Sequence, residues 1–323
     1  MDSPIIVTGG AGAIGSQLVK RLVHDEFAPT VIDNLSSGHK WLLPKDVSVL
    51  ERDVADIEQE STFGLSGGTV FHLAAFFANQ NSVENPELDL RTNGNGTLAL
   101  LRWAAETNAK KVIYASAGCS IVGHKAVGSI EEVEQATLHM DTPYQITKAL
   151  GEFYCCYFHE QVGLPTVRCR FFNSYGPGEV PGRYRNVIPN WIWAALHGKP
   201  LVITGTGDET RDFIYVDDLV DGLVKAANSP NADGQAFNLG TEIEVHIGDL
   251  AEWILKATDS NSKIVHAARR TWDRSMRRCA SIAKARQVLG FEPQTYIHDG
   301  LEKTVDWFLR NKQQIYKSAG GLA

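Results

Sequence analysis

Tyr144 and Lys148 stand four residues apart, where Pro143 is typical of the first turn of a helix. Residues at this spacing share one face of a helix. A nearby ammonium group favours the phenolate and lowers the pKa of a tyrosine. Such a phenol can remove a hydroxyl proton while a hydride leaves the same carbon. The spacing also occurs in ordinary surface helices, so the neighbouring elements must decide between the two interpretations.

A glycine-rich turn near the N-terminus is the first of these elements. A β-branched run over residues 5–8 leads into Gly9, Gly12 and Gly15, and an amphipathic helix follows. This G-x-x-G-x-x-G pattern between a strand and a helix is typical of dinucleotide binding. The glycines let the backbone approach a pyrophosphate, and the N-terminus of the helix attracts phosphate.

Asp33 ends the next predicted strand and indicates which dinucleotide binds. Its carboxylate can accept hydrogen bonds from both ribose hydroxyls of NAD, and it would repel the additional phosphate of NADP. No arginine or lysine follows before Lys40, which also favours NAD. The alternative is that Asp33 serves only the turn over residues 34–38.

The composition describes a soluble globular chain of about two domains. Of its 323 residues 43% are hydrophobic and 21% charged, and the net charge of −7 gives no basic footprint for nucleic acid. No apolar run reaches the ~20 residues of a membrane span, and no signal peptide precedes the first strand. Five cysteines without framework spacing favour a reduced, cytoplasmic setting. We expect no metal site, nucleic-acid partner or membrane segment.

Strand and helix patterns alternate up to residue 172, which predicts an α/β fold with a Rossmann-type, doubly wound parallel sheet. Strands are expected near 5–8, 29–33, 47–51, 69–73, 111–115 and 166–171, and helices near 13–24, 85–107 and 143–162. Residues 1–172, with a return segment at about 213–240, should form the dinucleotide domain. Residues 173–212 and 241–323 should form a smaller α/β substrate domain at the C-terminal end. In this second half a strand is expected at 201–204, with helices near 217–228 and 247–257.

The chain resembles the extended short-chain dehydrogenase/reductase superfamily, the NAD-dependent nucleotide-sugar epimerases and dehydratases. It is most similar to the branch that resembles UDP-glucose 4-epimerase. The resemblance covers nearly the whole chain and rests on residues 8–15, 33–38, 53–54, 72–75, 93–97, 144/148, 170–177 and 205–219. It implies tightly bound NAD, a nucleoside-diphosphate sugar as substrate, with UDP the expected nucleotide, and a homodimer formed through the helices near 85–107 and 143–162.

The strand ends and the resemblance together predict the residues that bind NAD. Asp53 and Val54 form a polar–apolar pair suited to an adenine edge, and the small residues after His72 allow a cofactor to lie close. Asn93 matches a buried family asparagine near the cofactor, with a helix N-cap as the alternative. The predicted set is Gly9, Gly12, Ala13, Ile14, Gly15, Asp33, Asn34, Ser36, Ser37, Gly38, Asp53, Val54, Leu73, Ala74, Ala75, Asn93, Ala115, Tyr144, Lys148, Phe171 and Phe172.

The second half of the chain supplies the predicted substrate site. An arginine at position 211 can clamp a diphosphate with two hydrogen bonds, and the alternative is a salt bridge between domains. Arg270 fits the family motif R-x-G-D best, although Trp272 replaces the glycine. Phe77 is interpreted either as an apolar lid over the sugar or as core. The predicted set is Phe77, Asn173, Asn186, Val187, Val202, Thr204, Arg211, Arg270 and Arg274.

The chain departs from the family where a serine or threonine hydroxyl usually meets the 4-hydroxyl of the sugar. Ala117 or Gly118 occupies this position, and Ser116 and Ser120 flank it. Cys119 lies at the offset at which the GDP-mannose 3,5-epimerase branch places a catalytic cysteine, and packing is its alternative role. The predicted catalytic residues are therefore Tyr144, Lys148, Ser116, Cys119 and Ser120.

The predicted reaction is epimerisation at C4 through a transient 4-keto sugar. The same intermediate also serves 3,5-epimerisation, dehydration and decarboxylation, although the Asp-Glu pair of the dehydratases is absent. A third possibility is an NAD-loaded sensor without turnover, supported only by the missing serine at position 117.

Overall fold

The computed structural model describes residues 1, 3–59, 66–118, 122, 128–132 and 136–319. The predicted catalytic residues Cys119 and Ser120 lie outside these residues. No helix of the described part is long and apolar enough to cross a membrane.

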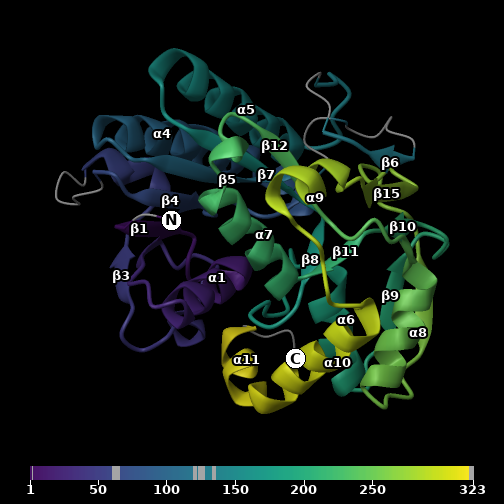
Figure 1. Ribbon diagram of the computed structural model, residues 1–323. Helices are drawn as coiled ribbons and strands as arrows, with labels where there is room; N and C mark the ends of the chain where they lie inside the picture. Colours follow the sequence, from purple (N-terminus) through teal and green to yellow (C-terminus); the bar gives the residue numbers. More distant parts are fainter. Residues whose placement is uncertain (2, 60–65, 119–121, 123–127, 133–135, 320–323) are drawn as a thin grey trace.

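A seven-stranded parallel sheet forms the centre of the larger half (Figure 1). Its order is β12-β7-β5-β4-β1-β2-β3, so the order reverses between β1 and β4. Ligands bind at such a switch point, outside the carboxyl ends of the strands. The predicted Rossmann-type sheet is thereby confirmed. The strands are β1 Ile5–Thr8, β2 Thr30–Asp33, β3 Ser48–Glu51, β4 Thr69–His72, β5 Lys111–Ala117, β7 Thr166–Phe171 and β12 Ala236–Leu239.

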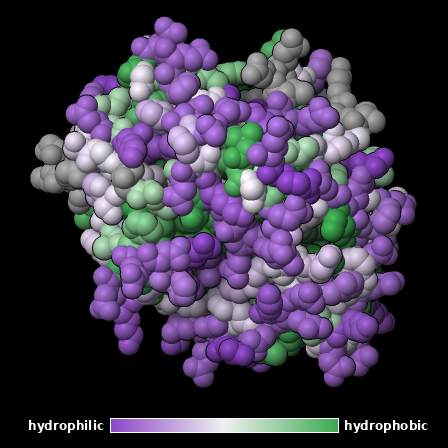
Figure 2. Space-filling view, in the orientation of Figure 1, coloured by the Kyte–Doolittle hydropathy of each residue, from purple (hydrophilic) through white to green (hydrophobic). Residues whose placement is uncertain are grey.

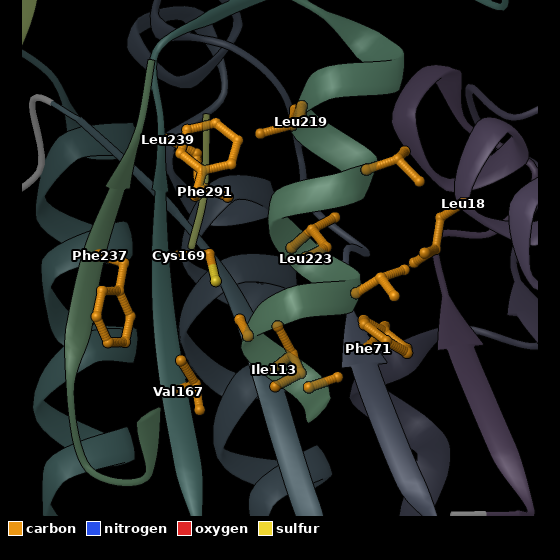
Figure 3. Close-up of a cluster of buried hydrophobic side chains, with 14 of the residues drawn as sticks. Leu18, Phe71, Ile113, Val167, Cys169, Leu219, Leu223, Phe237, Leu239 and Phe291 are labelled. Carbon is orange, nitrogen blue, oxygen red and sulfur yellow. The ribbon is translucent and has the colours of Figure 1, made fainter. Parts of the chain in front are cut away.

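One face of the sheet is covered by α1 (Ala13–His24) and α7 (Val216–Asn228). Figure 3 shows the apolar core that these two helices form with the sheet, with Leu223 of α7 above Ile113 and Leu18 of α1 above and to the right of Phe71. The helix α7 lies in the expected return segment, and β12 then extends the sheet beyond β7.

The other face is covered by α4 (Gly96–Glu106) and α5 (Pro143–Tyr157). The single helix predicted over 85–107 is instead α3 (Pro86–Asp89), the π-helix η3 (Leu90–Asn95) and α4. A Cβ on Gly94 would lie 2.9 Å from Leu90 Cδ1, so η3 is tightly packed. The end of the helix predicted over 143–162 is likewise a π-turn, η5 (Phe158–Val162).

The smaller half combines short sheets with helices around an aromatic core. Trp191, Trp193, Tyr175 and Phe308 are buried there. Its elements are β6 Ser129–Ile130, β8 Asn173–Tyr175, α6 Val187–Leu196, β9 Leu201–Thr204, β10 Thr210–Arg211, β11 Phe213–Tyr215, β13 Val245–His246, α8 Ile247–Ala257, β14 Ile264–Ala267, β15 Arg277–Ala280, α10 Ile297–Arg310 and α11 Lys312–Ser318. The helix α9 (Ala283–Leu289) instead packs back against α7 and β12 of the larger half. The 3₁₀ turns η1 Lys40–Leu42, η2 Val54–Gln59 and η6 Pro230–Ala232 complete the chain with α2 Asn79–Glu84.

The outer surface is mainly polar on the face shown in Figure 2, where hydrophobic residues form small, separate patches. The apolar side chains of the sheet and of its covering helices are instead buried. The helix α5 therefore packs on a buried apolar face of the sheet, mainly against β5.

Gly151 of α5 packs directly on the ring of Tyr114 in β5. A Cβ at this position would overlap the Tyr114 hydroxyl and Cζ, so we expect Gly151→Ala to destabilise the fold by about 1–3 kcal/mol, as overpacking does. Urea unfolding measures this loss. Tyr114→Phe in the Gly151→Ala background removes one of the overlapping atoms and should recover part of it. An undiminished stability of Gly151→Ala would contradict this packing of α5 on β5.

Candidate active site

The predicted pair Tyr144 and Lys148 lies on the buried face of the first turns of α5. Thr142 caps this helix by accepting a hydrogen bond from the Gln145 N–H, and Pro143 occupies the first turn. The Lys148 Nζ atom lies 5.8 Å from the centroid of the Tyr144 ring. Both side chains are buried, at 9% and 3% exposure. The ammonium group is therefore close enough to stabilise a phenolate in a medium of low dielectric constant.

Lys148 is held against the sheet by β5. Its Nζ atom donates a hydrogen bond to the Ala115 carbonyl oxygen at 2.9 Å, near the carboxyl end of the strand. Burial lowers the pKa of Lys148 to about 8, and the nearby carboxylate of Asp89 partly offsets this effect. The lysine thus remains mainly protonated at neutral pH while giving up its proton more readily than a surface lysine.

The backbone of Tyr144 is fixed by α2, an element that the sequence did not reveal. The Tyr144 N–H donates to Ser82 Oγ at 3.0 Å, and Thr142 Oγ1 donates to Asn79 Oδ1 at 2.7 Å. Phe77, just before α2, meets the Tyr144 ring edge-on with centroids 6.1 Å apart. Phe77 is half-buried, so it lies at the margin of the site rather than deep in the core.

Asn93 is enclosed by protein groups and sits inside the π-helix η3, so its alternative role as a helix N-cap is wrong. Its amide brackets the backbone of Phe76, accepting from the N–H at 2.8 Å and donating to the carbonyl at 3.1 Å. It also donates to Asp89 Oδ1 at 2.8 Å, and Asp89 Oδ2 accepts from Thr147 of α5 at 2.8 Å. This network joins the loop after β4 to the helix that carries Tyr144.

His72 at the end of β4 is a structural residue. Its ring lies between Thr8 Oγ1 at 2.8 Å and Thr97 Oγ1 at 3.0 Å. Complete burial, together with the charge of Lys148, lowers the pKa of His72 to about 3. The ring is therefore neutral and does not add a second positive charge beside Lys148.

Ser116 points toward the interior between β5 and α5. Its hydroxyl donates to Glu152 Oε1 at 2.5 Å, and Glu152 forms a buried ion pair with Arg170 at 2.8 Å. The Ser116 hydroxyl is thus hydrogen-bonded to a carboxylate of α5. Beyond it, a Cβ on Gly118 would lie 2.6 Å from the Phe172 ring, so Phe172 closes the strand end and Phe171 precedes it in β7.

The glycine turn fits a pyrophosphate. Gly9 has a φ of +67°, and a Cβ on it would lie 2.6 Å from the Ala74 nitrogen. A Cβ on Gly15 would overlap the Gly9 carbonyl oxygen, and one on Gly12 would lie 3.2 Å from it. Among the described residues no side chain caps α1, so its first turn, with Ala13 and Ile14, retains backbone N–H donors for phosphate.

Asp33 anchors the loop that follows β2. Its two carboxylate oxygens accept the N–H groups of Ala11 at 2.9 Å and Leu35 at 2.8 Å. Burial raises the pKa of Asp33, and these hydrogen bonds partly lower it. Each carboxylate oxygen has a second lone pair for a ribose hydroxyl. The turn interpretation and the ribose interpretation are therefore compatible.

The remaining predicted cofactor residues surround this loop. Asn34 donates to Asp53 Oδ2 at 3.0 Å and accepts from Ser36 Oγ at 2.7 Å. The Ser37 carbonyl accepts from Arg185 at 2.9 Å. Gly38 lies near these contacts, and a Cβ added to it would come 2.9 Å from Asp33 Oδ1. Val54, at the start of η2, is buried. The half-buried Leu73, Ala74 and Ala75 follow β4 on the other side of the turn.

On the substrate side Arg211 is engaged by Asp273. Its Nη2 atom donates to both carboxylate oxygens at 3.0 and 3.1 Å. This is a salt bridge within the smaller half, whereas the alternative interpretation had expected one between domains. The Asn173 side-chain amide donates to the Asp212 carbonyl oxygen at 2.9 Å, which joins the start of β8 to the residue after Arg211.

The other substrate candidates flank these residues. Asn186 precedes α6, and its N–H donates to Glu179 at 3.4 Å, while Val187 begins the helix. Val202 and Thr204 share the more exposed face of β9. Among the basic residues, the Arg270 guanidinium lies 5.5 Å from the Trp272 ring centroid, and Arg274 Nε lies 4.0 Å from Asp141.

The geometry defines a dinucleotide-dependent enzyme of the short-chain dehydrogenase/reductase type, with a glycine turn after β1 and a Tyr–Lys pair against β5. The profile of the NAD dependent epimerase/dehydratase family matches residues 5–240, and the chain belongs to this family. The family dependence on NAD agrees with the cofactor that Asp33 predicts.

Relatives of known activity extend this comparison. The chain is 33% identical over 319 residues to the UDP-N-acetyl-alpha-D-glucosaminuronate decarboxylase of Bacillus cytotoxicus, covering 95% of this chain and 98% of the relative. It is 33% identical over 315 residues to the UDP-glucose 4-epimerase of Mycolicibacterium smegmatis, covering 96% and 99%. The structure of the epimerase Mth375 from Methanothermobacter thermautotrophicus is 41% identical, with a TM-score of 0.92 over 97% of this chain and 94% of that one.

The buried charge of Lys148 predicts a specific pH dependence of stability. The pKa of Lys148 is about 8 in the folded protein and 10.5 for an ordinary lysine, so between these limits the unfolded chain binds one more proton than the folded chain. The free energy of unfolding should therefore rise with pH across this window by about 3 kcal/mol relative to Lys148→Met, and the cost of burial is fully present below pH 8. Urea unfolding of both proteins from pH 7 upward measures the difference. Parallel curves would contradict the burial of a charged lysine.

Proposed function

We propose that this protein is an NAD-dependent epimerase that inverts C4 of a nucleoside-diphosphate sugar, with UDP as the expected nucleotide. The observation that carries the proposal is the buried Tyr144–Lys148 pair against the end of β5. NAD, when bound, would supply a reversible hydride acceptor for the sugar carbinol. The glycine turn, Asp33 and the loops after β3 and β4 would hold the cofactor.

Tyr144 acts as the base that takes the proton of the 4-hydroxyl as a 4-keto sugar forms, and it returns a proton at the end. Lys148 supports this role because its ammonium group favours the phenolate. Arg211, Arg270 and Arg274 would bind the diphosphate. An anchor on the diphosphate allows the sugar to turn and present its other face, and substrate contacts with Asn186, Val187, Val202 and Thr204 would then fall on the nucleotide.

Decarboxylation of a nucleotide-linked hexuronate is the second candidate. It uses the same proton removal at C4, and a decarboxylase is among the relatives of comparable identity. The intact Tyr144–Lys148 pair argues against a sensor that has lost turnover. Incubation with UDP-glucose, UDP-N-acetylglucosamine and their glucuronate forms, followed by NMR and CO₂ detection, distinguishes the candidates. C4 epimers without CO₂ support the proposal.

Removal of the phenol tests the base directly. Tyr144→Phe should lower kcat by a factor of about 10² to 10⁴, because the 4-hydroxyl loses its proton acceptor. Product formation by NMR and cofactor content by absorbance are measured together. Tyr154→Phe, on the same helix, is the matched control and should retain activity. Full activity of Tyr144→Phe would rule out this assignment.

We also propose that residues 1–172 and about 213–240 serve the cofactor, while 173–212 and 241–323 serve the substrate. The described cysteines Cys155, Cys156, Cys169 and Cys279 carry free thiols, which supports a reduced, cytoplasmic setting. No metal-binding group of three or more His, Cys, Asp or Glu residues occurs among the described residues.

A homodimer is the proposed assembly because α5 presents exposed apolar side chains. Ile146, Phe153 and Tyr157 are 52–55% exposed, and Leu90 of η3 is 48% exposed. Their spacing of seven and four residues places those of α5 along one stripe, as a helix-to-helix interface requires.

A charge within this stripe should separate the subunits. Phe153→Glu is expected to sediment as a monomer where the unaltered protein sediments as a dimer, because a buried unpaired carboxylate is costly. Analytical ultracentrifugation measures the mass. Leu309→Glu on α10, at 55% exposure, is the control and should leave the dimer intact. A monomeric unaltered protein would refute the assembly.

A further inference from the structure

Asp141 is a buried carboxylate immediately before the cap of α5. Its side chain is 1% exposed and lies 4.0 Å from Arg274 Nε and 3.9 Å from Arg278 Nη2. Both arginines belong to the smaller half of the chain: Arg274 lies in the segment 268–276 between β14 and β15, which we name the arginine loop, and Arg278 in β15. A carboxylate withdrawn from water needs positive charge nearby, and these ion pairs supply it across the two halves.

Arg278 also faces the carboxylate that engages the proposed diphosphate anchor. Its Nη2 atom lies 4.0 Å from Asp273 Oδ1, and Asp273 accepts both hydrogen bonds from Arg211. A phosphate oxygen that bound Arg211 would compete with Asp273 for the same guanidinium. The carboxylate of Asp273 would then be free to interact with Arg278, the arginine that also faces Asp141. The occupancy of the anchor is thus linked to the start of the helix.

A second contact ties the arginine loop to the same place. Trp272 Nε1 donates to Gln80 Oε1 of α2 at 2.7 Å. The helix α2 carries Ser82, which accepts the Tyr144 N–H. Asp141 itself donates its backbone N–H to Gln145 Oε1 at 2.8 Å, within the first turn of α5. The Trp272 contact thus leads through α2 to the Tyr144 N–H, and the ion pairs of Asp141 lead to the first turn of α5.

We propose that Asp141 is a positioning residue for Tyr144, and that through Arg274 and Arg278 it couples the diphosphate-binding side of the cleft to the helix that carries the base. This inference rests on the proposed function. A sugar that must turn within the site cannot itself orient the base. A fixed electrostatic link from the anchor to α5 orients Tyr144 while leaving the sugar free.

Asp141→Asn tests the link with little change in volume. With UDP-N-acetylglucosamine or whichever UDP sugar the unaltered protein turns over, kcat should fall about tenfold or more, because small misplacements of a catalytic group are costly. KM should stay within about threefold, since Arg211 and Arg270 still bind the diphosphate. Asp141→Glu should restore part of kcat. Arg277→Gln is the matched control, because Arg277 pairs at the surface with Glu244 and should retain activity.

Arg278→Gln and the double variant Asp141→Asn/Arg278→Gln complete a cycle. We expect each single variant to lower kcat and the double variant to lose no more than the worse single one, as coupled residues do. Unchanged kcat in Asp141→Asn, or losses that multiply in the double variant, would overturn the inference alone. If Asp141→Asn does not fold, as judged by circular dichroism and cofactor content, normal kcat in Arg278→Gln overturns it. An unaltered protein that turns over no nucleotide sugar overturns the proposed function and the inference with it.

Discussion

The packing of α5 across β5 is the constraint on which the site depends. Three contacts within five residues of α5 make this crossing: Lys148 Nζ on the Ala115 carbonyl, Gly151 on the Tyr114 ring, and Glu152 on the Ser116 hydroxyl. Each needs a particular distance between helix and strand. A shift of α5 would break all of them together and would carry the phenol away from the ends of the strands.

Buried charge is the cost of this arrangement. Lys148, Asp89, and the pair Glu152–Arg170 all lie beneath the site. Replacing such groups by apolar residues is often neutral or stabilising in proteins, so stability does not explain them. They hold polar groups in one geometry: Asp89 aligns Thr147 and Asn93, and Lys148 bridges the carbonyl of β5 and the ring of Tyr144. These buried charges thus fix the orientation of the site at some cost in folding free energy, as is common in catalytic sites.

Much of the architecture could be predicted because it depends on local patterns. The bounds of β1, α1, β7, β9 and α8 follow from periodicity and glycine positions, and the parallel, doubly wound character of the sheet follows from the alternation of elements. The π-helix at Leu90–Asn95 could not be predicted, because its pitch is set by contacts with α5 and with the loop after β4. The same holds for α2, whose Ser82 meets Tyr144 only after the chain has folded.

Individual side chains show the same division. Asn93 was recognised as buried, but its partners Phe76 and Asp89 depend on how η3 packs. The sequence placed Ser116 next to the reacting groups, whereas the structure directs its hydroxyl to Glu152, eight residues beyond Tyr144 along the same helix.

The sequence by itself determined the glycine turn, the acidic end of β2, and the spacing of Tyr144 and Lys148, since each is a property of residue types at fixed intervals along the backbone. Only the tertiary structure decided which carbonyl holds Lys148, which helix fixes Tyr144, and which carboxylate faces Arg211 or Arg278. These pairs join residues that are tens to more than a hundred positions apart. Hydrogen bonds and ion pairs act over a few ångströms, so their partners are specified only when packing brings the segments together.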